Sequence, residues 1–382
     1  MIDFRAQLTR RFRSQQEFSD GYSPLYARLF GLVGDWLEVG ADEELANWLL
    51  DAGNGRSPLD ISLLLLAGLH RDILNREPGT AELAQYYPTV GGKRPLTDPQ
   101  LPEILRQTIL ARRDALAPFI QTAAVQTNET SRGIAWLLPL LYTDWEAVHL
   151  VDLGASAGLN LAAEARNYRL VDGEHHLDLG SGQPIQFLMQ SHGAFYQPPA
   201  TNRQPQILSR TGCDLAPFRL ETAVAEQTLA AFIWADQPHR LERLREGIAA
   251  YRQANQSRTP IHLHPARLPE DLPRFLSQHI PNQPNQPVVI YNTYMTAYLD
   301  DKGAAMRQHI ANWAVTQNRP ILWLQWEPLW DGPQAPAADL IAWTADYWHN
   351  NSHHHWRLAW NHPHGIHIHW QPDMARWAAF WS

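Results

Sequence analysis

The chain has 382 residues, of which 45% are hydrophobic and 18% are charged, and its formal net charge is −8. This composition supplies a sizeable core and excludes a chain that is disordered as a whole. So acidic a protein is a poor candidate for coating nucleic-acid phosphates. The single cysteine excludes a disulfide framework and a four-cysteine zinc site.

The first twenty residues mix both charges and lack the apolar stretch of a secretory signal. The longest apolar run, residues 61–68, is far too short to span a bilayer. The small basic cluster at residues 10–13 is typical of a solvated helix face. We therefore expect a cytoplasmic protein whose partner is a small-molecule substrate, with no nucleic acid and no membrane.

Helical spacing of apolar residues dominates the first part of the chain, for example over residues 61–74 and 101–109. Thr97, Asp98 and Pro99 are typical of a helix start, with a capping side chain and a proline in the first turn. We expect a helical cap domain over residues 1–145.

Short apolar runs alternate with helical patterns from residue 146 onward, which is typical of an α/β domain. The runs that predict strands are residues 148–153, 207–208, 261–263, 288–291, 321–324, 356–360 and 366–370. Residues 221–253 and 303–316 have helical spacing, and residues 361–365 are typical of a hairpin turn. We expect a methyltransferase-type Rossmann-like sheet over residues 146–382, mostly parallel, with a closing antiparallel hairpin. A further hairpin is expected in an insert at about residues 168–206.

The most informative segment is the loop Asp152-Leu153-Gly154-Ala155-Ser156-Ala157-Gly158, which follows the first predicted strand of this domain. Glycines at this point let the backbone approach a ligand closely, and the helix that follows presents free N–H groups. Serine at position 156 departs from the dinucleotide fingerprint. The pattern resembles the first motif of S-adenosylmethionine-dependent methyltransferases. A tight turn without a ligand is the alternative.

A second segment, Gly212-x-Asp214-x-x-Pro217, resembles the methyltransferase signature in which a carboxylate accepts hydrogen bonds from both ribose hydroxyls. The separation from Asp152 to Asp214 is 62 residues, whereas about 20 is usual. Asp172 lies at the usual separation and competes for the ribose. We favour Asp214, because Asp172 is followed by glycine within a hairpin-like sequence. Helix capping is the alternative role of Asp214.

Together these segments resemble the bacterial family called domain of unknown function 2332, over about residues 126–370. The matching residues are Gln126-Thr127-Asn128-Glu129 with Arg132, the loop from Asp152 through Asn160 and Leu161, Gly212-x-Asp214-x-x-Pro217, Trp234-x-Asp236-Gln237-x-x-Arg240, Tyr298-Leu299, Trp323-Leu324-x-x-Glu327 and His362-Pro363-His364-Gly365. The resemblance implies a methyltransferase-like fold, S-adenosylmethionine as cofactor, and a cofactor site that includes Asp152, Gly154, Ala155, Ser156, Gly158 and Asn160. It implies no particular substrate. One departure is Pro265, which stands where such folds often have an acid for the adenine amine.

Methyl transfer from a sulfonium requires an oriented acceptor and, for some acceptors, the removal of one proton. Acceptor-side residues usually follow the fourth strand, where Asn292 and Tyr294 lie, and Glu327 follows the fifth. We expect these three residues to orient or deprotonate the acceptor. Packing, capping and ion pairing are their alternative roles.

Two polar segments at predicted helix starts supply further candidates. We expect Asn128 and Arg132 to face the cofactor pocket, with Arg132 on the methionine carboxylate, although Asn128 also suits a helix cap. Asp236 either caps a helix or contacts the substrate.

Eighteen histidines, several in H-x-H pairs, raise the possibility of a metal site. We expect none, because His262/His264 and His367/His369 belong to strands near opposite ends of the predicted sheet. Residues 154–158 also match the G-x-S-x-G pattern, so a serine hydrolase with Ser156 as nucleophile and His364 as its histidine is an alternative. A non-catalytic nucleotide-binding protein is another.

Sixteen tryptophans are unusual for this length, and eleven of them fall in the last 70 residues. We expect most of these to pack one edge of the sheet, with Trp343 and Trp348 on a helix. Trp326 and Trp330 flank Glu327 at a strand's carboxyl end, so we expect them to form walls of the substrate site.

Overall fold

The computed structural model describes residues 4–126, 129–182, 187–195, 197–199, 204–337 and 339–382. They divide into two compact units, one of residues 1–128 and 220–242 and the other of residues 129–219 and 243–382. This division differs from the expected boundary at residue 145. Helix α7 (Ile134–Leu140) shares a core with the sheet, whereas Phe232, Trp234 and Ala235 pack into the helical core.

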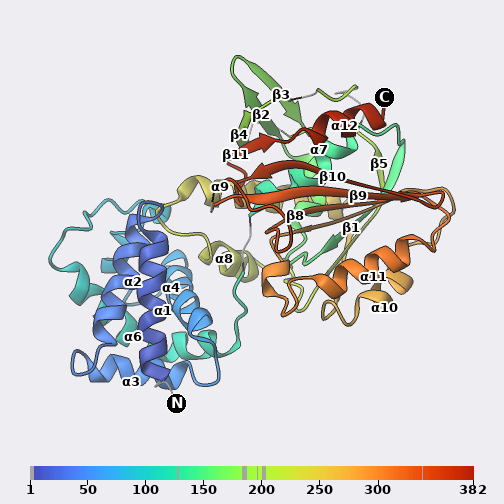
Figure 1. Cartoon of the computed structure of the whole chain (residues 1–382). Coiled ribbons are helices and arrows are strands. Elements are labelled where there is room, and N and C mark those ends of the chain that lie inside the picture. The colour runs from blue at the N-terminus through green and yellow to red at the C-terminus, as the bar shows by residue number, and fades with distance from the viewer. Residues whose placement is uncertain (1–3, 127–128, 183–186, 196, 200–203, 338) are drawn as a thin grey trace. The chain divides into compact units, whose positions relative to one another are not determined.

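The first unit consists of helices, as its apolar spacing predicts (Figure 1). Its helices are α1 (Phe4–Ser19), α2 (Pro24–Trp36), α3 (Glu43–Ala52), α4 (Pro58–Leu74), α5 (Ala81–Ala84), η1 (Pro88–Val90), α6 (Leu101–Thr122) and α8 (Ala223–Ala231). Their apolar stripes meet in one core that includes Leu8, Phe30, Leu64 and Ile109, all fully buried. Helix α9 (Pro238–Asn255) begins in this unit and continues into the second.

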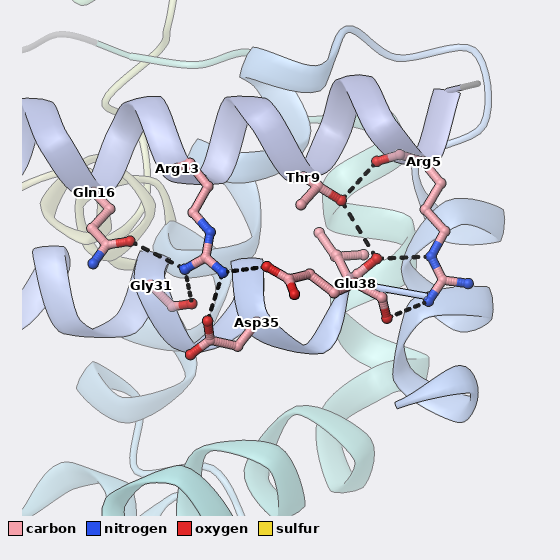
Figure 2. Close-up of polar contacts among 8 residues, drawn as sticks. Arg5, Thr9, Arg13, Gln16, Gly31, Asp35 and Glu38 are labelled. Atoms are coloured by element: carbon pink, nitrogen blue, oxygen red, sulfur yellow. Dashed lines mark hydrogen bonds and ion pairs between the residues drawn. The ribbon is translucent and has the colours of Figure 1, made fainter. Parts of the chain in front are cut away.

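Polar contacts join α1 to α2 and to the residues just after it (Figure 2). Arg13 donates to Asp35 at 2.6 Å and to Glu38 at 2.7 Å, and Arg5 Nε donates to the carbonyl oxygen of Leu37 at 2.8 Å. The Arg13 and Glu38 side chains remain 34% and 60% exposed, so solvent screens their attraction. These pairs therefore orient the two helices while the buried apolar stripe supplies most of the stability.

The second unit is a mixed α/β structure whose described residues form one mostly parallel sheet of 11 strands. The strands are β1 (Ala147–Leu153), β2 (Tyr168–Asp172), β3 (His175–Leu179), β4 (Phe187–His192), β5 (Gln206–Asp214), β6 (Ile261–Pro265), β7 (Val288–Thr293), β8 (Ile321–Glu327), β9 (Ile341–His349), β10 (Ser352–Asn361) and β11 (His367–Trp370). Every apolar run that predicted a strand overlaps one of them, although residue 366 lies just before β11. The two expected hairpins are present as the antiparallel pairs β2/β3 and β10/β11.

In space the strands follow the order β3-β2-β4-β11-β10-β9-β8-β7-β1-β5-β6. After β1 the chain forms β2, β3 and β4, which lie beyond β11. It then forms β5 and β6 on one side of β1 and returns to β7 and β8 on the other. The direction of progression thus reverses between β1 and β7. In open α/β sheets, ligands bind outside the carboxyl ends of the strands at such a reversal.

Helices cover both faces of the central strands (Figure 1), and alternate residues of these strands belong to two different cores. Val148 and Leu150 of β1 belong to the core that includes α7 and α12 (Asp373–Phe380), whereas Val151 and Leu153 belong to the core that includes α10 (Leu272–His279) and α11 (Ala304–Ala314). Because both faces are covered, these strands appear in the sequence as continuous apolar runs.

Two helix predictions need correction. Residues 341–349, expected to carry Trp343 and Trp348 on a helix, form strand β9 between β8 and β10. The segment is rich in aromatic and β-branched residues, which favour strands, and both of its faces are buried. The expected helix over residues 221–253 is divided into α8 and α9, with Pro238 as the first residue of α9.

A fully buried arginine joins separate segments of the second unit. Arg166 donates to the carbonyl oxygen of Thr130 at 2.7 Å, to the carbonyl oxygen of Arg243 at 3.1 Å and, through Nε, to Glu246 at 2.7 Å. Its charge is therefore neutralised and its donors are used. The arginine holds α9 and the short helix η2 (Thr130–Gly133) to the chain segment that follows β1.

We predict that Arg166→Met lowers the free energy of unfolding by about 3–5 kcal/mol, because it leaves a carboxylate and two carbonyl groups without their donor. Arg13→Met, which removes a half-exposed pair, is expected to cost less than about 1 kcal/mol. Urea unfolding of both variants measures the difference. Equal losses in the two variants would contradict the role assigned to Arg166.

Candidate functional site

The glycine loop follows β1 at the carboxyl edge of the sheet, and its backbone adopts left-handed conformations. The φ angles are +82° at Gly154, +49° at Ser156 and +74° at Gly158. A side chain at Gly154 would bring its Cβ within 2.9 Å of the Cβ of Met295. The sequence pattern therefore predicted a tight turn correctly, and position 154 tolerates only glycine without rearrangement.

The loop's N–H groups are largely used within the protein. Those of Gly154 and Ala155 both donate to the carbonyl oxygen of Cys213, at 2.8 and 2.9 Å, and that of Ser156 donates to Asp214 Oδ2 at 2.9 Å. Phosphate-binding loops direct such groups at the ligand instead. The loop is thus unsuited to a pyrophosphate, in agreement with its departure from the dinucleotide fingerprint.

Asp214 ends strand β5, directly beside β1, and so lies against the glycine loop. Its Oδ1 accepts the N–H of Ala216 at 3.1 Å, while its Oδ2 accepts that of Ser156. Each carboxylate oxygen offers about two acceptor sites, so both keep capacity for a further donor. Asp172 ends strand β2, and six strands separate β2 from β1. At about 4.8 Å per strand, Asp172 is tens of ångströms from the loop.

Asp152 is the second-to-last residue of strand β1, just before the loop, and is only 3% exposed. The hydroxyl group of Tyr291, on the neighbouring strand β7, donates to its Oδ2 at 2.7 Å. Burial raises the pKa of Asp152 to about 7, and the Tyr291 hydrogen bond opposes this only partly. The site thus contains a carboxyl group that titrates near neutral pH.

Asn292 and Glu327, two of the expected acceptor-side residues, form a hydrogen bond with each other. The Asn292 amide donates to Glu327 Oε1 at 2.8 Å and accepts from the indole of Trp323 at 2.7 Å. Glu327 also accepts the backbone N–H groups of Met295 and Thr296 and the Thr296 hydroxyl group. Both side chains are buried, and burial raises the pKa of Glu327. They hold the turn after β7 in place.

Tyr294 and Arg132 meet at the end of β7. The Arg132 guanidinium lies 5.1 Å from the centre of the Tyr294 ring, and it donates to the carbonyl oxygens of Pro363 at 3.0 Å and Thr293 at 3.5 Å. Tyr294 itself has a φ of +55°. Arg132 is 4% exposed, so a buried positive charge lies at the end of β7.

A histidine and a glutamate form a pair that the sequence did not reveal. His364 Nδ1 lies 3.0 Å from Oε2 of Glu129, whose side chain is 3% exposed. The Ser131 hydroxyl group donates to the carbonyl oxygen of His364 at 3.0 Å, which fixes the turn that carries the histidine. The partners are 235 residues apart, so no local pattern could have paired them. A buried carboxylate on Nδ1 is the arrangement that orients a general base.

Asn160 and Asn128 are two further residues that the sequence predicted to bind the cofactor. Asn160 donates from Nδ2 to the carbonyl oxygen of Glu129 at 3.3 Å, and its buried Oδ1 has no partner among the described residues. Asn128 lies outside the described residues. Asn160 thus joins the segment after the glycine loop to the one that carries Glu129 and Arg132.

The predicted substrate residues do not form one group. Asp236 belongs to the first unit, where it accepts the Ser23 hydroxyl group at 2.6 Å and the Leu25 N–H at 3.1 Å, and so holds the start of α2. Trp326 is fully buried and stacks on Trp343 with 5.3 Å between ring centres, a core position rather than an open wall. Trp330 is 43% exposed and lines a cavity.

No group of three histidine, cysteine, aspartate or glutamate side chains among the described residues is placed to hold a metal ion. The pairs His262/His264 and His367/His369 lie on β6 and β11, with six strands between them, as expected from the sheet. No helix in the described part of the chain is long and apolar enough to cross a membrane.

Residues 9–370 match the family model described as uncharacterized protein conserved in bacteria, DUF2332. Because the match covers most of its length, the chain belongs to this family. A search of curated proteins finds no match.

We predict a pH-dependent stability difference between the wild type and Asp152→Asn. A carboxyl group whose pKa rises from 3.8 to about 7 on folding binds its proton more tightly in the folded state. The wild type should therefore lose stability relative to the variant as pH rises from about 4 to about 7, by up to about 4 kcal/mol, and no further above that. Urea unfolding across this range measures the effect, with Asp331→Asn as an exposed control. A constant difference at all pH values would contradict the raised pKa.

Proposed function

We propose that the protein is an S-adenosylmethionine-dependent methyltransferase that acts on a small-molecule acceptor. The observation that carries the proposal is the hydrogen bond from the Ser156 N–H to the Asp214 carboxylate. It places a glycine loop and an acid side by side, at the carboxyl ends of two adjacent parallel strands. These are the two elements that the methyltransferase resemblance requires to meet.

The nucleoside half of the cofactor is assigned to Asp214 and its neighbours. Both oxygens of Asp214 can accept a ribose hydroxyl in addition to their backbone donors. Leu215, the next residue, is 65% exposed and offers an apolar surface to a base. Pro265 lies directly beside Asp214 in the register of β5 and β6, so apolar contact replaces the absent acid at the adenine.

The methionine half is assigned to the opposite side of the crevice. The close approach of Gly154 to Met295 marks the point where β1 and the turn after β7 meet. The Asp152 carboxylate, at the end of β1, suits the ammonium group of the cofactor. Arg132 supplies a positive charge beside the same turn for its carboxylate. The N–H groups of the glycine loop donate to protein acceptors, and this is consistent with a cofactor that has no phosphate for them to bind.

The proton acceptor is assigned to His364 rather than to Asn292 or Glu327. The latter two are buried and engaged with each other and with the turn after β7. His364 is oriented by Glu129 through Nδ1, and a histidine positioned by a carboxylate is the side chain that most often takes a proton from an oxygen or nitrogen nucleophile. The acceptors that this arrangement favours are thus hydroxyl or amine groups.

We predict that the purified protein binds S-adenosylhomocysteine in isothermal titration calorimetry. Asp214→Asn should weaken binding about tenfold or more, because it removes the charge from the ribose hydrogen bonds. Asparagine keeps an oxygen for the Ser156 N–H, so the loop is perturbed little. Asp172→Asn is the matched control and should bind like the wild type.

Absence of binding by the wild type would refute the proposal, as would an equal effect of the two variants. Binding without transfer of a labelled methyl group to any acceptor in a lysate would instead support a non-catalytic nucleotide-binding protein.

A serine hydrolase remains the second candidate, because Ser156 has a positive φ of +49° and His364 is paired to a buried acid. Both features belong to nucleophile–histidine–acid sites. Against it, Asp214 and Arg132 have no part in acyl transfer. We expect a fluorophosphonate probe to leave the wild type unlabelled. Labelling that disappears in Ser156→Ala would favour the hydrolase instead.

A further inference from the structure

A cavity of about 420 Å³ lies against strands β8, β9 and β10, beside helix α11. Its volume is in the range of small-molecule pockets. Its lining includes Trp323, Gln325, Thr344, Asp346, Trp348 and His355 from the strands, together with Arg307 from α11. The glycine loop and Asp214 are not part of it. The cavity is thus a second candidate binding site, whose lining also includes Thr296 of the turn after β7 and Glu327, which holds that turn.

Indole rings form apolar walls of this cavity. Trp323 and Trp348 are 2% and 6% exposed, and Trp348 stacks on His353 with 4.6 Å between ring centres. Trp330, from the segment after β8, forms a more exposed wall and donates to the Thr296 hydroxyl group at 3.2 Å. Flat aromatic walls suit a planar ligand.

Both buried acids in the lining are satisfied by the protein. Asp346 Oδ1 accepts from His353 Nε2 and from His355 Nδ1, each at 2.9 Å, and its Oδ2 accepts from Gln325 at 3.4 Å. Glu327, at the other end, accepts donors from the turn after β7. A ligand therefore need not supply hydrogen-bond donors to these two acids.

Two positively charged hydrogen-bond donors in the lining, His355 and Arg307, favour an anionic ligand. The hydrogen bond to Asp346 raises the pKa of His355, and Asp373 adds to this while burial and Arg357 oppose it. Burial works to raise the pKa of Asp346, but the bonds from the two histidines lower it overall. The pair thus favours an ionised Asp346 and a protonated His355, whose Nε2 is left as a charged donor. The Arg307 guanidinium, which donates to the carbonyl oxygen of Lys302 at 3.1 Å and lies 3.7 Å from the exposed Asp331 carboxylate, supplies a second charged donor.

We propose that this cavity binds a small aromatic carboxylate, with its ring against Trp323 and Trp348 and its carboxylate at His355 and Arg307. The matched hydrogen-bonding geometry of guanidinium and carboxylate favours this class over a neutral ring. The inference stands apart from the proposed methyl transfer, since the two sites share no residue assigned to the cofactor.

Benzoate is the probe, and isothermal titration calorimetry is the measurement. The wild type should bind benzoate more tightly at about pH 6 than at about pH 8, since His355 loses its proton as pH rises. Benzamide, which has the same shape without the charge, should bind about tenfold more weakly at the lower pH.

Variants identify the site. His355→Gln and Arg307→Gln should each weaken benzoate binding about tenfold. His354→Gln is the matched control, because the ring of His354 stacks on Trp356 and Phe380, outside the cavity lining. Arg307 lies on a helix surface, so it gives an answer even if the His355 variant unfolds. Failure of the wild type to bind benzoate, or equal binding by Arg307→Gln and His354→Gln, would overturn the proposal.

Discussion

The hydrogen bond from the Ser156 N–H to Asp214 is the contact on which the candidate site depends. It joins the loop after β1 to the end of β5. The N–H groups of Gly154 and Ala155, which donate to the carbonyl oxygen of Cys213, join the same two segments. A serine with positive φ is conformationally unfavourable by about 1–2 kcal/mol, so the loop needs these bonds to hold its shape. The sheet order places β7 beside β1 on the side away from β5, so the turn after β7 and Asp214 lie on opposite sides of the glycine loop.

Buried carboxylates at this edge of the sheet have distinct roles because their donors differ. Glu327 accepts several backbone and side-chain donors and acts as a structural anchor for the turn after β7. Asp152 has one tyrosine donor, and burial raises its pKa to about 7. Glu129 faces His364 and orients its ring. Burial alone therefore does not identify a catalytic acid, and the partners of each carboxylate decide its role.

The backbone pattern of the second unit was largely predictable, whereas its side-chain pairings were not. Strands covered on both faces appear as apolar runs, and the glycines after β1 require a tight turn. Strand β9 was missed because a segment buried on both faces shows neither the alternation of apolar and polar residues typical of a strand nor the apolar spacing typical of a helix. The sequence favoured Asp214 over Asp172 on local pattern alone, and the strand order shows that only Asp214 lies beside the glycine loop. The pairing of Glu129 with His364 depends on tertiary structure across 235 residues.

A crystal structure of the protein with S-adenosylhomocysteine tests the central claim most directly. The account predicts that both ribose hydroxyls donate to the Asp214 carboxylate and that the amino-acid end lies between Gly154 and Arg132. A nucleoside bound elsewhere, or a glycine loop that remains without a ligand at saturating concentration, would contradict it.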